Sequence, residues 1–328
     1  MTKKDNSSKN STLIDNALQI SAELEQTVEE MIQSNKQDVS DHWDEAISDI
    51  QYVPVDNGEI RVVHANPESP VGQRPIVFVP GWGTTIKTFK DFYGILKGKV
   101  ELFYVETREK GSSKITIRKA DMSIHQKAKD IQNIINHFEL NKRDFVLMAP
   151  CWGGTIILQG LLDKTITAPT YVVFDPMHYF WYNNFFMRYF VPVLPASVVY
   201  LMKPILKFFA LRGMKAKVQR QRTETLIDAA APRKWKKAAL ANLDLELFGK
   251  LSAIEEEVFV FNGTTDKIHD QQDYPLMAQE IPNGRFFYMK TDESKREYLM
   301  GTIALEFSKV SQKQGVPSTL KPFEKMLK

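Results

Sequence analysis

Cys151 is the residue in this sequence most clearly suited to chemistry, and it is the only cysteine among 328 residues. It follows the apolar run Phe145 to Met148, with Ala149 two residues before it and Gly153 two residues after it. A nucleophile on a tight turn from strand to helix needs small residues at those positions, because larger side chains would collide with neighbouring backbone. The helix expected after the turn would favour the thiolate. The pattern predicts a nucleophile for ester or thioester chemistry, with a buried structural cysteine as the alternative.

The elements around Cys151 alternate between apolar strands and amphipathic helices, which predicts a mostly parallel sheet covered by helices on both faces. The Asn57-Gly58 pair between two apolar runs predicts an opening hairpin over residues 52–63. The expected strands are 76–79, 100–105, 145–148, 171–174, 258–261 and 285–289, and the expected helices are 86–96, 124–138, 153–162, 271–280 and 295–310. The predicted fold class is therefore α/β.

The alternation also predicts how the chain is divided. Residues 49–175 and 251–310 form the α/β core, and the helical, aromatic and basic stretch 176–250 is an inserted cap. Residues 1–48 comprise a disordered start and one amphipathic helix over residues 13–34, which acts as a packing arm or contacts a partner. The tail 311–328 is expected to be weakly structured.

Several motifs over residues 50–310 resemble the α/β-hydrolase superfamily. The sequence Val-Pro-Gly-Trp-Gly at 79–83 is similar to the oxyanion loop of that superfamily, and residues 107–113 are similar to its Asp-Arg-Gly-x-Gly-x-Ser stretch. The sequence Cys-Trp-Gly-Gly at 151–154 resembles the elbow of dienelactone hydrolases. With Thr155 it also resembles that of polyhydroxyalkanoate synthases. Both groups use a cysteine nucleophile.

The resemblance implies roles for further residues. The backbone N–H groups of Trp82 and Trp152 would form the oxyanion hole that stabilises the charge developing on an attacked carbonyl. The tryptophan side chains could also simply be core. Asp266, in Asn-Gly-Thr-Thr-Asp at 262–266, would be the acid that orients a base, and Asp175 at the end of the preceding strand is the alternative acid.

The histidine that the superfamily places after its last strand is absent from residues 290–296. His178 and His269 are the two candidates that could reach the site from another direction. The other four histidines are expected to be solvated or to pack in the fold, with His64 at the surface: His42, His64, His125 and His137. The site could therefore recruit an unusual base, depend on a thiolate that needs little activation, or have lost catalysis.

The cap composition indicates the ligand. Residues 179–190 contain eight aromatics in twelve, which favours a hydrophobic acyl substrate, with a cap core as the alternative. Residues 203–237 contain eleven Lys or Arg against Glu224 and Asp228. This basic stretch suits an anionic membrane surface or a phosphate-bearing acyl donor such as a coenzyme A thioester, and a solvated helix face is the alternative.

Composition excludes several classes. A net charge of +3 and the lack of a recognisable module exclude a nucleic-acid partner, and no phosphate loop or metal-ligand spacing predicts a cofactor. Without a signal-like or membrane-spanning stretch, the expected location is cytoplasmic, with peripheral membrane association open. The predicted function is an acyl ester or thioester hydrolase, or an acyltransferase, with a cysteine nucleophile and a hydrophobic substrate. The alternative is a catalytically silent lipid- or acyl-binding protein.

Overall fold

The computed structural model describes residues 12–40, 49–180, 184–212, 217–264 and 270–327. The strands within these residues are β1 (Asp49–Val55), β2 (Gly58–Ala65), β3 (Ile76–Phe78), β4 (Leu102–Glu106), β5 (Lys114–Ile115), β6 (Val146–Pro150), β7 (Thr170–Phe174), β8 (Val258–Asn262), β9 (Gly284–Tyr288) and β10 (Glu324–Lys325). The helices are α2 (Ala22–Asn35), α3 (Lys90–Leu96), α4 (Ile124–His137), α5 (Cys151–Leu162), α6 (Asn184–Tyr189), α7 (Ala196–Leu201), α8 (Lys203–Arg212), α9 (Lys217–Ala229), α10 (Pro232–Leu240), α11 (Asp273–Glu280) and α12 (Arg296–Lys309).

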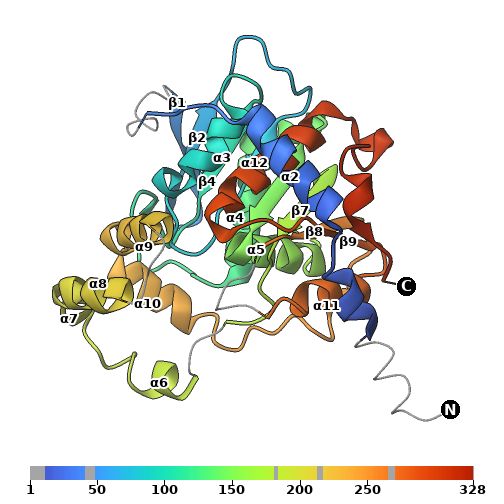
Figure 1. Cartoon of the computed structure of the whole chain (residues 1–328). Helices are drawn as coiled ribbons and strands as arrows, with labels where there is room; N and C mark the ends of the chain where they lie inside the picture. Colours follow the sequence, from blue (N-terminus) through green and yellow to red (C-terminus); the bar gives the residue numbers. More distant parts are fainter. Residues whose placement is uncertain (1–11, 41–48, 181–183, 213–216, 265–269, 328) are drawn as a thin grey trace.

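The ten described strands form one mixed sheet through the centre of the molecule (Figure 1). Its order is β1-β2-β4-β3-β6-β7-β8-β9-β10, with β5 paired to β2. Neighbouring strands from β4 to β9 are parallel, whereas the pairs at both edges are antiparallel. The predicted α/β architecture with a mostly parallel sheet is confirmed.

The core lies in two layers, one on each face of the sheet. Side chains of β6 alternate between them: Leu147 and Ala149 face the layer under α4, α5 and α11, and Val146 and Met148 face the layer under α2, α3 and α12. Every residue of β6, β7 and β8 is buried. This continuous burial explains why the strands appear as unbroken apolar runs, and it makes β6 a rigid base for the residue that follows it.

The opening hairpin forms as predicted. Val55 of β1 pairs with Gly58 of β2 across a two-residue turn. Asn57 has φ 58°, a left-handed conformation that asparagine adopts more readily than most residues.

Two expectations about the chain ends are wrong. The predicted single helix over residues 13–34 is two helical segments, residues 12–17 and α2, because the Ser21 side chain accepts the Leu24 N–H and starts a new helix. The tail is ordered rather than weakly structured: β10 pairs with β9, and Leu320 and Phe323 are fully buried. Residues 1–11, whose disorder was expected, lie outside the described residues.

Two smaller corrections concern the interior. Helix α5 begins at Cys151 itself, not at Gly153. His64 is not at the surface: its side chain is only 14% exposed and forms ion pairs with Asp49 and Glu101.

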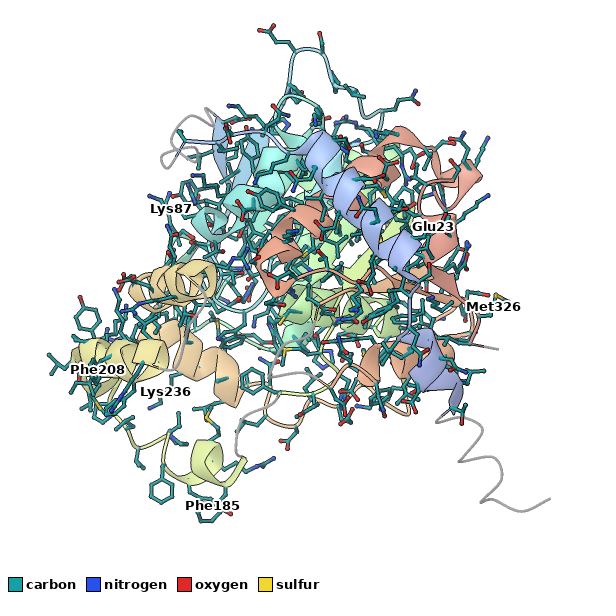
Figure 2. The ribbon with its side chains drawn as sticks, viewed as in Figure 1. Glu23, Lys87, Phe185, Phe208, Lys236 and Met326 are labelled. Atoms are coloured by element: carbon teal, nitrogen blue, oxygen red, sulfur yellow. The ribbon has the colours of Figure 1, made fainter. Side chains whose placement is uncertain are left out.

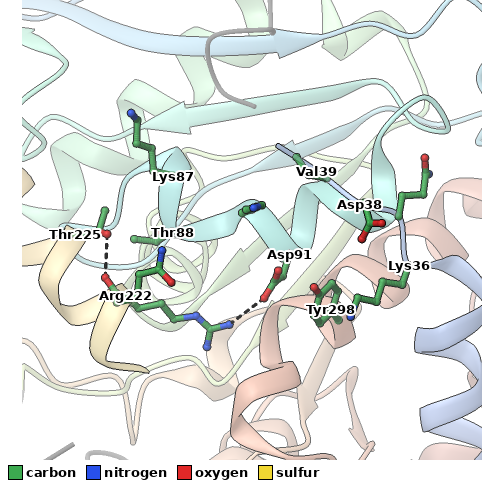
Figure 3. Close-up of a pocket in the computed structure, with 12 residues that line it drawn as sticks. Lys36, Asp38, Val39, Lys87, Thr88, Asp91, Arg222, Thr225 and Tyr298 are labelled. Atoms are coloured by element: carbon green, nitrogen blue, oxygen red, sulfur yellow. Dashed lines mark hydrogen bonds and ion pairs between the residues drawn. The ribbon is translucent and has the colours of Figure 1, made fainter. Parts of the chain in front are cut away.

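Helices α6 to α10 lie between β7 and β8 in the sequence, and they project from one side of the sheet (Figure 1). We call residues 184–240 the lobe; the cap boundaries at 176 and 250 remain a prediction. Arg222 of α9 fastens the lobe to the core by ion pairs with Asp91 of α3 and Glu297 of α12. Arg222 and Asp91 also line a polar cleft of about 310 Å³ between α3 and α9 (Figure 3).

Candidate active site

Cys151 stands at a sharp turn directly after the central strand β6. It is the first residue of α5, and its φ of 48° lies in the left-handed region. That conformation is costly for a residue with a side chain, so the surrounding structure must impose it. The side chain is partly exposed, and the turn therefore presents the sulfur at the carboxyl edge of the sheet.

Glycines make room for this turn. A Cβ atom on Gly153 would lie 2.0 Å from the carbonyl oxygen of Val79, the residue after β3, so only glycine lets α5 approach the end of that strand so closely. A Cβ on Gly81 would lie 3.5 Å from Cβ of Cys151, which places the loop after β3 against the cysteine. The motifs at 79–83 and 151–154 are about seventy residues apart in the sequence, and the structure brings them into contact.

Asp175 lies next to Cys151 because their strands are paired in parallel register. Pro150 of β6 pairs with Phe174 of β7. The residues that follow these two strands, Cys151 and Asp175, therefore lie at the same edge of the sheet. Asp175 also has φ 48° and is almost fully buried. Asn262 donates its side-chain N–H to one carboxylate oxygen at 2.6 Å. The alternative acid of the sequence analysis is therefore beside the cysteine.

The second oxygen of Asp175 binds Arg296, a residue that the sequence analysis did not consider. The Arg296 Nε donates to Asp175 at 3.2 Å, and the guanidinium lies 5.3 Å from the centre of the Phe174 ring. Burial opposes its charge, but Asp175, Glu293 and Cys151 together raise the pKa of Arg296 above its usual range. Arg296 is the last residue of the stretch 290–296 in which a histidine was expected, so an obligate cation extends from that stretch to the acid.

His178 is not directed at the cysteine. Its Nδ1 lies 2.9 Å from Glu246 and its Nε2 lies 3.2 Å from Asp273, so carboxylates occupy both ring nitrogens. Burial disfavours protonation, but these two carboxylates raise the pKa of His178. With a carboxylate at each ring nitrogen, His178 has no free nitrogen with which to take a proton from Cys151. The other candidates, Asp266 and His269, lie outside the described residues, as does His42.

Aromatic rings surround the turn. Trp82 and Trp152 meet edge to face with ring centres 5.4 Å apart, and Phe180 packs against both at 5.2 and 5.4 Å. Trp235 of the lobe lies 6.2 Å from Trp82. The buried indole N–H groups of Trp82, Trp152 and Trp235 have no hydrogen-bond acceptor among the described residues. The surroundings of the turn are therefore mostly apolar, with a few polar donors.

The sulfur of Cys151 contacts an apolar side chain, Met177, which lies three residues after β7. Cys151 Sγ lies 3.4 Å from Met177 Sδ. The Thr155 hydroxyl donates to the Met177 carbonyl at 2.7 Å and holds this segment against α5. Trp152 is the second residue of α5, and helix geometry leaves the N–H groups of the first turn without intrahelical partners. Its backbone N–H is thus suited to stabilise an oxyanion, as the resemblance implies.

A buried charge network supports the loop of Gly81 and Trp82. Lys110 Nζ donates to the Gly81 carbonyl at 3.2 Å, and burial lowers the pKa of Lys110 to about 8 against the opposing effect of Glu109. Lys127 lies 3.5 Å from Glu109 and 5.0 Å from the ring centres of both tryptophans. In the sequence, Lys110 belongs to the motif 107–113 but has no assigned role there. Lys127 is not singled out, because both lysines stand among polar residues and nothing local signals their burial.

Two further features lie outside this arrangement. Among the described residues, no group of three or more His, Cys, Asp or Glu side chains is placed to hold a metal ion. Cys151 is not among the residues that line the polar cleft between α3 and α9.

The fold is similar to that of several solved enzymes. An esterase from Exiguobacterium antarcticum is 16% identical, with a TM-score of 0.63 over 79% of this chain and 99% of that one. An esterase from Thermogutta terrifontis is 16% identical, with a TM-score of 0.57 over 78% and 96%. A bromoperoxidase from Bacillus anthracis is 11% identical, with a TM-score of 0.59 over 78% and 97%. No protein-family model matches the sequence, and no curated protein matches it.

These likenesses, with the sheet order and the turn at Cys151, establish that the chain has the α/β-hydrolase fold. At such low identities they establish the fold and not the reaction, since one fold supports many chemistries.

Proposed function

We propose that the protein performs acyl chemistry on a hydrophobic ester or thioester, with Cys151 as the nucleophile. The observation that supports this proposal most strongly is the left-handed turn at Cys151, with Gly153 packed on β3 and the Gly81 loop against the cysteine. A merely structural cysteine does not require a strained position at the carboxyl edge of a sheet, where ligands of open α/β folds bind.

The proposed step is an attack of the Cys151 sulfur on the acyl carbonyl carbon. The carbonyl oxygen becomes negatively charged and is stabilised by the backbone N–H groups of Trp82 and Trp152. The carbonyl then re-forms, the bond to the alcohol or thiol leaving group breaks, and that group takes up the proton that the thiol gave up. The product is a thioester on Cys151. Phe180, Met177 and the indole rings offer an apolar environment for the acyl chain.

Within this proposal, transfer of the acyl group is better supported than hydrolysis. Hydrolysis needs a base to activate water after the thioester has formed. Arg296 cannot accept a proton, and both nitrogens of His178 are occupied. An acyl acceptor that is itself a good nucleophile, such as a thiol, makes less demand on a base. Two of the structurally similar proteins are esterases by name, which supports ester chemistry in general.

The test is to incubate the protein with p-nitrophenyl esters of short and long acyl chains and to map adducts by mass spectrometry. We expect one acyl group on the peptide that contains Cys151, a burst of one equivalent of nitrophenol, and slow turnover. The Cys151→Ala variant should show neither adduct nor burst. Trp152→Phe keeps the backbone N–H and should still be acylated. A folded protein that shows no adduct and no turnover with either ester would contradict the proposal.

The Arg296–Asp175 pair also favours a second candidate, an acyl- or lipid-binding protein without catalysis. Arg296 stands where a catalytic base is expected, and an arginine cannot accept a proton. A site of this kind can still bind an acyl chain but lacks the base for turnover. In that case fatty acid would change the fluorescence of Trp82, Trp152 and Trp235 equally in the wild type and in Cys151→Ala, and no thioester would form.

A further inference from the structure

The lobe exposes an unusual amount of apolar surface. Fifteen large apolar side chains are exposed among the described residues, and all but Ile50, Tyr52, Val71 and Met326 lie between residues 179 and 209. Surface apolar residues are normally scattered, and a cluster of this kind marks an interaction site. We call the seven of these lobe side chains that are each more than 60% exposed the outer face: Phe185, Tyr189, Val193, Tyr200, Leu201, Phe208 and Phe209.

Helix α8 directs lysine side chains toward the lobe and large apolar side chains toward solvent. Lys203 and Lys207 lie four residues apart, and both contact α9 or the residue that follows it. Ile205, Phe208 and Phe209 lie on the other faces and are 53%, 61% and 64% exposed. A helix on the surface of a water-soluble domain normally places these classes the other way round.

The inward lysines are fastened within the lobe. Lys207 bridges Glu224 and Asp228 of α9 at 2.6 and 2.8 Å, and Lys203 donates to the carbonyls of Asp228 and Ala230. Lys236 of α10 likewise donates to two carbonyls, those of Pro192 and Leu194. These lysines belong to the basic stretch predicted to bind an anionic membrane, yet in the structure they brace the helices so that the apolar residues face outward.

The shape and chemistry of the outer face fit a lipid layer better than a protein partner. Helices α6, α7 and α8 are the outermost part of the projecting lobe, and Phe185 and Phe208 point away from it (Figures 1 and 2). A protein interface typically needs about ten hydrogen bonds across well-matched surfaces. A convex tip of phenylalanine, leucine and tyrosine offers few such groups. Tyrosine is enriched at membrane–water interfaces, and phenylalanine and leucine form the buried face of helices that lie in them.

We propose that the outer face inserts into the interfacial region of a lipid bilayer, and that apolar burial rather than headgroup charge drives the binding. Within the described residues no helix is long and apolar enough to cross a membrane, so the contact is with one surface of the bilayer. Binding by apolar burial persists in neutral lipid and at high salt, whereas attraction between lysines and anionic headgroups is screened by salt. The inference is independent of the proposed reaction.

The test is flotation of the full-length protein with vesicles of phosphatidylcholine alone and with added phosphatidylglycerol, each at low and high salt. We expect flotation in all four conditions. The double variant Phe208→Ser, Phe209→Ser should lose it at least tenfold, because it removes two exposed rings without touching the α9 face. Met326→Ser is the matched control: Met326 is 80% exposed and lies on the opposite side of the molecule in Figure 2, so this variant should float normally.

Three outcomes would overturn the inference: no flotation with neutral lipid, flotation that high salt abolishes, or equal flotation of the double variant. A dimer detected by light scattering and abolished in the double variant would instead assign the outer face to a second copy of the chain. Cys151→Ala should float like the wild type, so failure of the acyl chemistry and failure of membrane binding are distinguishable.

Discussion

Arg296 is the residue that most changes what the site can do. A guanidinium remains charged at every pH that the folded protein experiences, so it can hold Asp175 and attract negative charge but cannot act as a base. Asp175 is fixed by Asn262 and Arg296 at the edge that Cys151 shares. In the proposed chemistry, the nucleophile Cys151 and the acid Asp175 are therefore accompanied by a cation where proton transfer would be needed.

This arrangement predicts that a histidine at position 296 would add turnover. In the Arg296→His variant an imidazole next to Asp175 could accept the proton of an attacking water. Because a positioned general base contributes about 10²–10⁴-fold, release of the acyl group should become on the order of 100-fold faster above about pH 6.5. Steady-state nitrophenol release after the burst measures this rate. Arg296→Gln, which removes the cation without supplying a base, is the control, and equal rates in the two variants would contradict the prediction.

Among the residues of the site, Cys151 and its small neighbours could be predicted from the sequence, whereas Arg296 could not. The turn is a local pattern, so the spacing of Ala149 and Gly153 was enough to predict it. The contact of Arg296 with Asp175 spans 121 positions, and arginine is not a residue type that a search for a base would select. Only the packing of α12 beside β7 and β8 shows the pair.

At the scale of elements, His64 links three strands. It lies in β2 and contacts Asp49 of β1 and Glu101 beside β4, both at 3.0 Å. Burial disfavours its protonation, but Glu101 and Asp49 raise the pKa of His64. A pKa that is higher in the folded state than in the unfolded state stabilises the fold below the unfolded value, about 6.5, and this contribution disappears as pH rises through the folded value.

His64→Gln should therefore lower the free energy of unfolding most in mildly acidic solution. Near pH 6 the loss of charged hydrogen bonds should cost about 2 kcal/mol, and near pH 9 the cost should be smaller. Urea unfolding at both pH values measures the difference. The exposed imidazole of His125, replaced in the same way, is the matched control; a pH-independent cost at His64 would contradict the assigned charge.

Most elements were predictable because the sheet is buried on both faces, and buried parallel strands are short apolar runs between helical patterns. The misses have local physical causes. The two-residue strands β5 and β10 are too short to show periodicity. The break between residues 17 and 22 depends on the Ser21 cap and not on a change of apolar spacing.

At the scale of the whole molecule, the C-terminal tail closes one face of the sheet. Phe323 and Leu320 enter the core layer under α2, α3 and α12, and β10 covers the edge of β9. The tail has no regular apolar period, so its order comes from contacts with residues distant in sequence, which a search along the chain cannot find.

Phe323→Ala should consequently reduce the free energy of unfolding by about 3–5 kcal/mol, the usual cost of emptying a buried phenylalanine site. Met326→Ala, three residues further on and 80% exposed, should change it by less than about 0.5 kcal/mol. Denaturant unfolding of the two variants makes the comparison. Similar small effects would mean that the tail does not contribute to the core.

The left-handed turn at Cys151 also bears on what maintains this residue. A side chain held at such a φ costs about 1–3 kcal/mol, whereas the extra freedom of glycine in the unfolded chain costs only about 0.4–1 kcal/mol. Glycine at position 151 would therefore give the more stable fold, but without the sulfur. Cysteine at this position therefore lowers thermal stability. On the proposed chemistry, the Cys151→Gly variant should have a higher melting temperature and should form no acyl adduct.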